Sequence, residues 1–151
     1  MVDPSSDAFL GDTELAAWHG MLTVHARLVR ELDRRLRADH GLAVVDFDVL
    51  ITLFNADPQG VRMTDLANAI MLSPAGLTHL VTRLERDRLV ERQTDPADRR
   101  SSRVRLSGAG RARLAAARAT HNEVVRGRFT AKVSDRQLRQ LAQVWSAILD
   151  R

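Results

Sequence analysis

The chain has 151 residues, 44% of them hydrophobic and 28% charged, which is the balance of a globular protein with one domain or two small lobes. It contains no cysteine, which excludes disulfides, thiolate metal sites and cysteine nucleophiles. The acidic start lacks an apolar signal segment and no apolar run is long enough to span a membrane, so we expect a soluble, cytoplasmic protein with no membrane partner.

The net charge is only +4, but it is distributed unevenly along the chain. Residues 62–113 hold eleven arginines against six acidic residues, and the rest of the chain is close to neutral. A basic middle of this kind favours a surface that meets a polyanion.

The first predicted elements are two helices. Apolar residues recur in steps of three and four over 13–39, which predicts a long amphipathic helix that Gly41 ends. A second helix is expected over 44–55, before the turn signal "ADPQG". Aromatic residues are only 4% of the chain, which agrees with a mainly helical protein.

Residues 64–86 show the pattern of a helix-turn-helix. Thr64 is the expected N-cap of a short helix, and a turn follows it at Met71. Ser73 then supplies an N-cap and Pro74 the first position of a longer helix. The apolar face of this helix is opposite a face of small and polar residues, namely Ala75, Gly76, Thr78, His79, Thr82, Arg83 and Arg86.

The next two segments alternate apolar and polar residues, as strands do. "LVERQ" at 89–93 and "RVRLS" at 103–107 predict a β-hairpin whose tip is the polar, arginine-rich stretch between them. A hairpin that directly follows a helix-turn-helix is a wing. Such a domain touches DNA in two ways, with its helix in the major groove and its wing tip along the backbone or in the minor groove.

Two further helices are predicted in the last part of the chain. One starts at Ser107 and runs to about Phe129, and Ser134 with Gln137 forms a capping box that opens the other. The expected fold is therefore mainly α with a small β-hairpin wing.

The chain resembles the MarR family of bacterial transcription regulators over nearly its full length. The resemblance lies in the order of the predicted elements and in two sequence segments. "LSPAGLTHLVTRLERDRLVER" is similar to the family's recognition helix leading into the wing. In "DPADRRSSRVRLSGAGR", Asp98 and Arg100 match the family's Asp-x-Arg, while Ser107 and Gly110 match its helix start. The resemblance implies a winged helix-turn-helix domain joined to a helical dimerisation region made from both chain ends.

The resemblance also implies a domain division and an assembly. Residues 1–42 would form the N-terminal helix of the dimerisation region, 43–107 the DNA-binding domain and 108–151 the C-terminal dimerisation helices. A homodimer would read a pseudo-palindromic, double-stranded operator with half-sites about one DNA turn apart. The residues expected at the dimer interface are Leu15, Leu114, Phe129, Leu138, Leu141, Trp145 and Ile148.

Two residues depart from the family pattern. Arg88 and Met71 stand where glycines are usual, after the recognition helix and in the turn before it. A left-handed conformation costs a residue other than glycine about 1 kcal/mol, so we expect the helix end at Arg88 to be built differently.

The residues expected to bind DNA lie on the recognition helix and in the wing. Arg100 would reach the minor groove or its phosphates, with Asp98 orienting the loop rather than facing DNA, and Arg83 would reach a guanine or a phosphate. The alternatives are a solvated hairpin turn and, for Thr82, Arg83 and Arg86, a solvated helix face. The full set is Ser73, Pro74, Ala75, Thr78, His79, Thr82, Arg83, Arg86, Asp98, Arg99, Arg100 and Arg103.

The resemblance further suggests a cleft between the first two helices and the winged domain, in which a small aromatic or anionic effector would bind. The residues that would line it are Trp18, His19, Met21, Leu22, His25, Phe47 and Phe54. For His25 the favoured alternative is a histidine of the core or of the dimer interface. A metal site of His19, His25 and His121 has no supporting spacing, so no metal or cofactor is expected.

These features favour a dimeric, sequence-specific transcriptional regulator, a repressor that an effector releases from DNA. A basic architectural protein that binds nucleic acid without sequence preference is the alternative, and an activating role stays open. The chain has no tyrosine and shows no nucleophile elbow, P-loop, HExxH or dinucleotide fingerprint, so we do not expect an enzyme.

Overall fold

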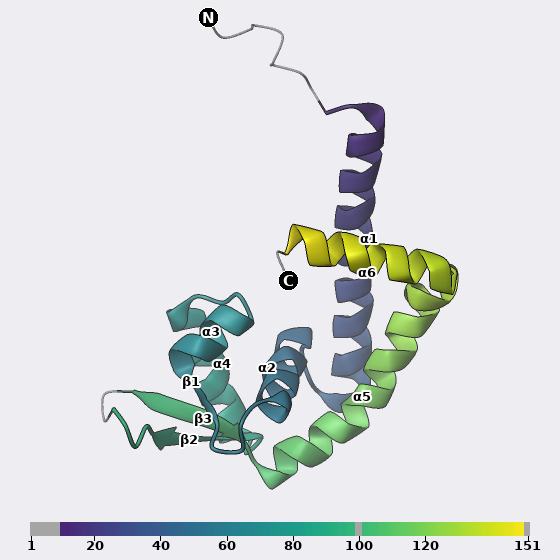
Figure 1. Ribbon diagram of the computed structural model, residues 1–151. Coiled ribbons are helices and arrows are strands. Elements are labelled where there is room, and N and C mark those ends of the chain that lie inside the picture. The colour runs from purple at the N-terminus through teal and green to yellow at the C-terminus, as the bar shows by residue number, and fades with distance from the viewer. Residues whose placement is uncertain (1–9, 99–100, 150–151) are drawn as a thin grey trace, which may run out of the picture.

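The computed structural model describes residues 10–98 and 101–149, so the predicted wing-tip residues Arg99 and Arg100 lie outside the described part. Its elements follow the predicted order (Figure 1). They are α1 (Asp12–His40), α2 (Val44–Asn55), β1 (Val61–Arg62), α3 (Met63–Ala69), α4 (Pro74–Arg86), β2 (Val90–Thr94), β3 (Ser102–Leu106), α5 (Gly108–Arg128), the 3-10 turn η2 (Thr130–Lys132) and α6 (Asp135–Ile148).

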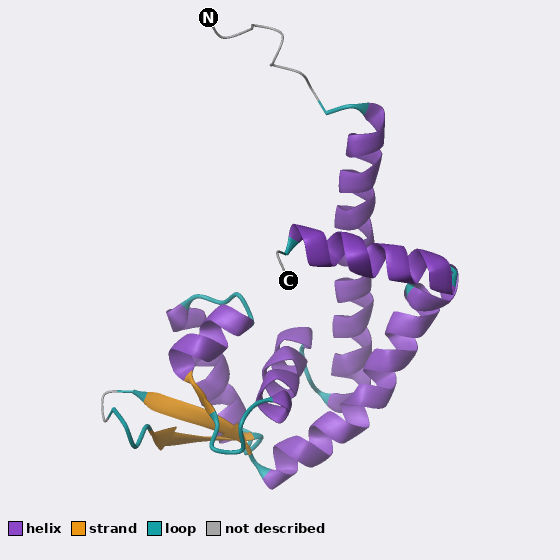
Figure 2. Cartoon of the chain, viewed as in Figure 1, coloured by secondary structure: helices purple, strands orange, loops and turns teal. Residues whose placement is uncertain are grey.

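The protein is mainly helical with a small sheet, as predicted, and its elements form a lobe and an arm (Figure 2). Helices α2, α3 and α4 and the three strands make the lobe, and the long helices α1 and α5 lead away from it toward α6. Helix α5 packs against both α1 and α2, so it joins the arm to the lobe. At this junction the buried Thr120 of α5 hydrogen-bonds His40 at the end of α1, with 2.8 Å between Oγ1 and Nε2.

The sheet has the strand order β1-β3-β2 and both of its pairs are antiparallel. In the hairpin Val90 pairs with Leu106, which agrees with the alternation of the two segments. The two-residue strand β1 is too short for an alternating pattern, and it adds to the sheet by pairing Val61 with Val104. Because β1 runs directly into α3, the sheet joins the wing to the helix-turn-helix.

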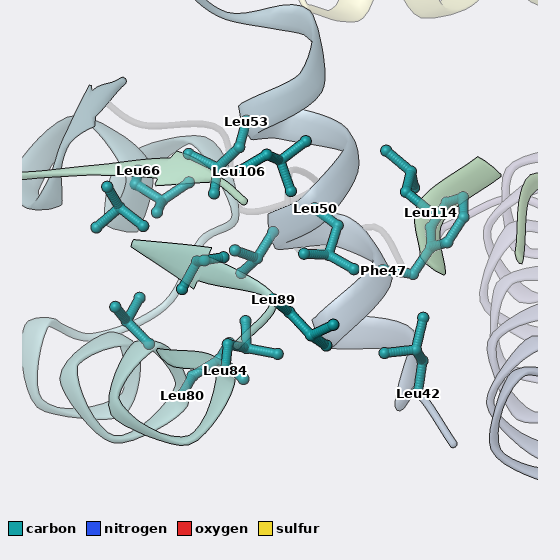
Figure 3. Close-up of a cluster of buried hydrophobic side chains, with 14 of the residues drawn as sticks. Leu42, Phe47, Leu50, Leu53, Leu66, Leu80, Leu84, Leu89, Leu106 and Leu114 are labelled. Carbon is teal, nitrogen blue, oxygen red and sulfur yellow. The ribbon is translucent and has the colours of Figure 1, made fainter. Parts of the chain in front are cut away.

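The core is built mainly from aliphatic side chains, together with Phe47, and α1 and α5 contribute to it (Figure 3). Leucines with 1% exposure or less are Leu36, Leu42, Leu50, Leu66, Leu77, Leu84 and Leu114. The expected place of Leu114 at a dimer interface is therefore wrong. Helix α5 begins against the lobe, so Leu114 is buried within its own chain and has no surface left for a partner.

Outside the lobe, the apolar stripes of α6 and of the first half of α1 stay exposed. Every residue of α6 is at least partly exposed, and Ile148 exposes 65% of its surface. On α1, burial begins only at Leu32, and Trp18 is 49% exposed. Amphipathic helices with uncovered apolar faces are typical of surfaces that bind a partner.

The serine caps predicted for three helices are confirmed. The Oγ atoms of Ser73, Ser107 and Ser134 each accept a hydrogen bond from the backbone N–H three residues on, at 3.1, 2.9 and 3.4 Å. The expected cap at Thr64 is wrong. Helix α3 begins at Met63, one residue before Thr64, because it continues straight from β1.

Met71 and Arg88 both adopt the left-handed conformation, with φ of 54° and 60°. The expectation that the helix end at Arg88 is built differently is therefore wrong. The end of α4 is closed by a hydrogen bond from the Leu89 N–H to the Leu84 carbonyl, 2.8 Å long, which requires this turn. Each of the two residues carries strain of about 1 kcal/mol that a glycine would not have.

Gly110 lies where α5 passes closest to the residue before β2. A Cβ at this position would stand 1.9 Å from the carbonyl oxygen of Leu89, a backbone atom that cannot swing away.

We expect Gly110→Ala to lower the free energy of unfolding by at least about 1–3 kcal/mol through overpacking, measured by urea denaturation. The matched control is Gly108→Ala in the same helix, where a Cβ meets open space. That variant should be neutral or stabilise by up to about 1 kcal/mol, and equal losses in both would contradict the close contact.

Candidate nucleic-acid interface

Helix α4 divides its residues between the core and the solvent. Leu77, Leu80, Val81 and Leu84 are buried against the lobe. The opposite face is exposed, and it carries the predicted residues Ser73, Pro74, Ala75, Thr78, His79, Thr82 and Arg86. The face has no acidic residue before Glu85, which is exposed in the last turn and pairs with Arg92 of β2, with 3.8 Å between Oε2 and Nε, so it offers little repulsion to a polyanion.

The first turn of α4 presents small groups beside a helix N-terminus. Ser73 caps the helix and Pro74 occupies its first position. The Thr78 hydroxyl donates its proton to the Pro74 carbonyl at 2.8 Å, which leaves its methyl group and an acceptor oxygen for the surroundings. Anions are stabilised beside a helix N-terminus, so this turn suits a phosphate next to small side chains.

Arg83 has an internal partner. Both of its terminal nitrogens bond the carboxylate of Asp46, which is buried in α2. The same carboxylate accepts a hydrogen bond from the backbone N–H of Ala43, 2.7 Å away, at the start of α2. The structure thus uses Arg83 to fix α4 against α2. Sequence reasoning missed this role because Asp46 is remote along the chain.

Two other arginines beside the exposed face differ in how they are held. Arg92 of β2 donates from Nη2 to the Thr82 hydroxyl at 3.3 Å, which links the wing to α4. Arg86, in the last turn of α4, is exposed and pairs with Asp87 at 3.2 Å. An exposed ion pair of this kind contributes little free energy to the fold, so the Arg86 guanidinium can exchange the Asp87 carboxylate for a phosphate.

A second buried carboxylate organises the wing. Asp95 follows β2 and is 1% exposed. Its oxygens accept hydrogen bonds from the Ala97 N–H at 2.9 Å, the Arg62 Nε at 2.7 Å and the Arg103 Nε at 3.2 Å. These bonds, those from Ala97 and Arg62 foremost, lower the pKa of Asp95 to about 2. The carboxylate therefore stays ionised at neutral pH and holds two strands by their arginines.

Two predicted wing residues lie close to this carboxylate. Arg103, the second residue of β3, also donates from Nη1 to the Gly60 carbonyl at 2.9 Å, so its guanidinium is held between that carbonyl and Asp95. The backbone of Asp98 closes the turn, because its N–H bonds the Asp95 carbonyl and its carbonyl accepts from the Ser101 N–H. Sequence reasoning missed Asp95, although an aspartate that opens a turn commonly bonds the backbone two residues on.

The predicted effector residues lie in two different surroundings. The five on the first half of α1 are exposed, and they are Trp18, His19, Met21, Leu22 and His25. Phe47 is buried in α2 and stacks on His121, with 4.6 Å between ring centroids. Phe54 is exposed, and the Arg118 guanidinium lies 5.4 Å from its ring centroid.

A hollow of about 460 Å³ lies beside α1 on the side of η2. It is lined by Val24, Arg27, Leu28, Arg30, Glu31, Arg34, Arg128 and Lys132, which do not belong to the predicted effector set. Since His25 is exposed, the alternative of a core histidine is wrong, and its place at an interface stays a prediction.

Within the described ranges, no group of histidine, aspartate and glutamate side chains is arranged to hold a metal ion. His121 instead stacks on Phe47, and its Nδ1 lies 3.3 Å from the Asn122 Oδ1. None of the helices in the described part is both long enough and apolar enough to cross a membrane.

Comparison with known proteins bears on the same residues. The MarR family model matches residues 42–102, from just before α2 to the start of β3. AbsC, a MarR family transcriptional regulator from Streptomyces coelicolor, is 31% identical, with a TM-score of 0.87 over 95% of this chain and 96% of that chain. Sco3205, a MarR family transcriptional regulator from the same organism solved in complex with DNA, is 26% identical, with a TM-score of 0.88 over 95% and 89%.

A third structure, CouR from Rhodococcus jostii RHA1 bound to p-coumaroyl-CoA, is 26% identical, with a TM-score of 0.74 over 85% of this chain and 87% of that chain. Two HTH-type transcriptional regulators of Bacillus subtilis (strain 168), one of them a repressor, also match, and the chain spans about half the length of these curated relatives. The likeness to AbsC covers nearly the whole of both chains, and the protein therefore belongs to the MarR family of transcriptional regulators.

Proposed function

We propose that the protein is a homodimeric, sequence-specific DNA-binding regulator that represses its target promoters. The observation that carries this proposal is the exposed face of α4, which adjoins the wing and has no acidic residue before Glu85 in its last turn. The pair of Asp46 and Arg83 fixes that face relative to the core. The structure of Sco3205 in complex with DNA supports this use of the shared fold.

In this proposal α4 enters the major groove with its first turn foremost, as the DNA-binding domain of residues 43–107 meets the duplex. Ala75 and the Thr78 methyl suit the methyl groups of thymines, and His79 suits a base edge. The phosphate contacts are Ser73, Arg86, Arg99 and Arg100, of which the last two lie outside the described residues.

The homodimer is proposed from the uncovered apolar stripes of α6 and α1. A second copy offers the same stripes around a two-fold axis, so each chain covers the other's apolar surface. The proposed interface residues are Leu15, Phe129, Leu138, Leu141, Trp145 and Ile148, all at least partly exposed in the single chain. Two copies of α4 then read half-sites about one DNA turn, roughly 34 Å, apart.

We extend the proposal to a small aromatic or anionic effector that releases the protein from DNA. CouR, which is similar to this chain, is solved with p-coumaroyl-CoA, a ligand that is both aromatic and anionic. The exposed residues of the first half of α1, together with Phe54, are the proposed site. Release requires that the effector binds the arrangement unable to hold DNA more tightly than the DNA-bound one.

Fluorescence anisotropy with a duplex from upstream of the protein's own coding region tests the function. The titration is run with excess unrelated DNA and at two salt concentrations, because non-specific binding is dominated by phosphate charge. Binding that survives the competitor supports the sequence-specific regulator. Binding that any DNA competes away, with no preferred site in a genome-wide selection, would make it an architectural protein.

Removing one proposed phosphate contact tests the orientation of α4. We expect Arg86→Ala to weaken binding on every DNA sequence and to make the log–log salt slope shallower by about one. Arg126→Ala is the matched control, since both are exposed arginines in the last turn of a helix, and it should leave the slope unchanged. Anisotropy titrations across a salt series measure both. Equal slopes for the two variants would remove Arg86 from the DNA contacts.

The wing should depend on the charge of Asp95. We expect Asp95→Asn to weaken operator binding severalfold with no change in helix content by circular dichroism, because the Arg62 and Arg103 guanidiniums lose their shared partner. The control is Glu91→Gln, which breaks an exposed pair with Arg105 on the same hairpin and should have little effect.

The pH dependence of the wing follows from the same carboxylate. The pKa of Asp95 is lower in the folded chain than in the unfolded chain. Its contribution to the stability of the folded wing is therefore present above about pH 4 and is lost as the pH falls toward about 2. Amide hydrogen exchange at Ala97 over this range should show the loss in the wild type and not in Asp95→Asn. A pH response that is the same in both proteins would contradict the assignment.

The assembly is tested on α6. We expect Ile148→Asp to shift the protein to the monomer in light scattering and to abolish operator binding, because a carboxylate would be buried without a partner in the interface. Helix content should stay unchanged, since Ile148 is exposed in the single chain. Gln143→Asp, on the other face of α6, is the control and should remain dimeric. A dimer that tolerates Ile148→Asp would place the interface elsewhere.

A further inference from the structure

Met71, in the turn between α3 and α4, combines two properties that are rarely found together. Its φ of 54° lies in the left-handed region, where glycine is unstrained and a methionine is not. The residue is also 92% exposed, against 65% for Ile148, the next most exposed large apolar residue of the described chain. The side chain therefore adds strain to the turn and gains no burial in return.

The turn itself does not need a long side chain at this position. The Met71 N–H bonds the Asn68 carbonyl at 3.3 Å and the Leu72 N–H bonds the Ala67 carbonyl at 3.0 Å, and glycine could make the same backbone bonds. Leu72, the next residue, is half-buried and packs toward the core. The fold thus needs the backbone of Met71 and the side chain of Leu72. The thioether side chain of Met71 has no role in the fold and is free to contact a molecule outside the chain.

We propose that Met71 is a further specificity-determining residue, whose side chain packs against the apolar surface of DNA beside α4; this rests on the proposed function. Met71 lies two residues before the cap Ser73, at the end of α4 that would enter the groove. No acidic residue lies between 66 and 84 to keep a polyanion away. An unbranched methionine adapts to irregular apolar surface, and DNA offers such surface at thymine methyl groups and on the deoxyribose.

The experiment compares three variants in operator titrations and thermal melts. Met71→Gly should weaken operator binding by about tenfold, the effect of losing one buried apolar side chain. Met71→Leu keeps the apolar volume and should stay within about threefold of the wild type. Both results are read as ratios to wild-type affinity at one salt concentration.

Arg88→Gly is the matched control, because it relieves the same left-handed strain at the other end of α4. The Arg88 carbonyl, which accepts from the Ser107 hydroxyl at 2.6 Å, is backbone and is kept in the variant. Its operator affinity should not change. In both glycine variants the melting temperature should be unchanged or higher by about 2–4 °C, because strain is removed and no buried contact is lost.

Operators with deoxyuridine in place of single thymines identify the apolar partner, since deoxyuridine lacks only the methyl group. If one substitution weakens binding by the wild type and not by Met71→Gly, the side chain packs on that thymine methyl. If Met71→Gly is weaker but no thymine position distinguishes the two proteins, the side chain packs on deoxyribose, which carries no sequence information, and its role in specificity is overturned.

Unchanged operator affinity in Met71→Gly, or an equal loss in Arg88→Gly, overturns the contact while leaving the proposed function intact. A lower melting temperature of Met71→Gly also overturns it, because the side chain would then support the fold. A wild-type protein without any sequence preference would contradict the proposed function itself.

Discussion

The orientation of the exposed face of α4 depends on one buried carboxylate. Asp46 lies in the first turn of α2, accepts the Ala43 N–H that starts that helix and binds the Arg83 guanidinium of α4. A buried charge that loses its partner destabilises a protein by several kcal/mol. Any other position of α4 on α2 would leave this carboxylate unpaired in the core, so the two helices hold one arrangement.

The wing has a second buried carboxylate that pairs with arginines, Asp95. Because of these two carboxylates, not every arginine of the basic middle of the chain is available to nucleic acid. Arg62, Arg83 and Arg103 are partly exposed but paired with buried carboxylates, so their charge is partly neutralised before any nucleic acid arrives. The face of α4 that remains is small, polar and weakly charged. In the proposed function, discrimination among DNA sequences would then rest on the fit of side chains to base edges rather than on the strength of the electrostatic field.

What could be predicted from the sequence was local. The cap at Ser73 and the alternation of the hairpin depend on residues within a few positions of each other, and both are found in the structure. The carboxylate partners of Arg83 and Arg103 lie 37 and 8 residues away along the chain, on other elements, so no helix or strand periodicity predicts these pairs. Leu114 looked like an interface residue because periodicity shows that a helix face is buried, but not by which neighbour.

The backbone at Arg88 shows a different limit. Propensity correctly gives the cost of the left-handed conformation, but the closure of α4 by the Leu89 N–H requires that conformation, so the chain adopts it. A local preference of about 1 kcal/mol is easily outweighed by the packing of a whole helix end.

The short strand β1 has a consequence for how an operator is read. Since Val61 pairs with Val104, the strand that leads into α3 and the wing belong to one sheet, and Asp95 joins them again through Arg62 and Arg103. Helix α4 and the wing therefore move together as one rigid unit. In the proposed dimer, the separation of the two α4–wing units is the quantity left to vary. The preferred spacer length between half-sites would then change with the state of the protein, while the base pattern within each half-site would not.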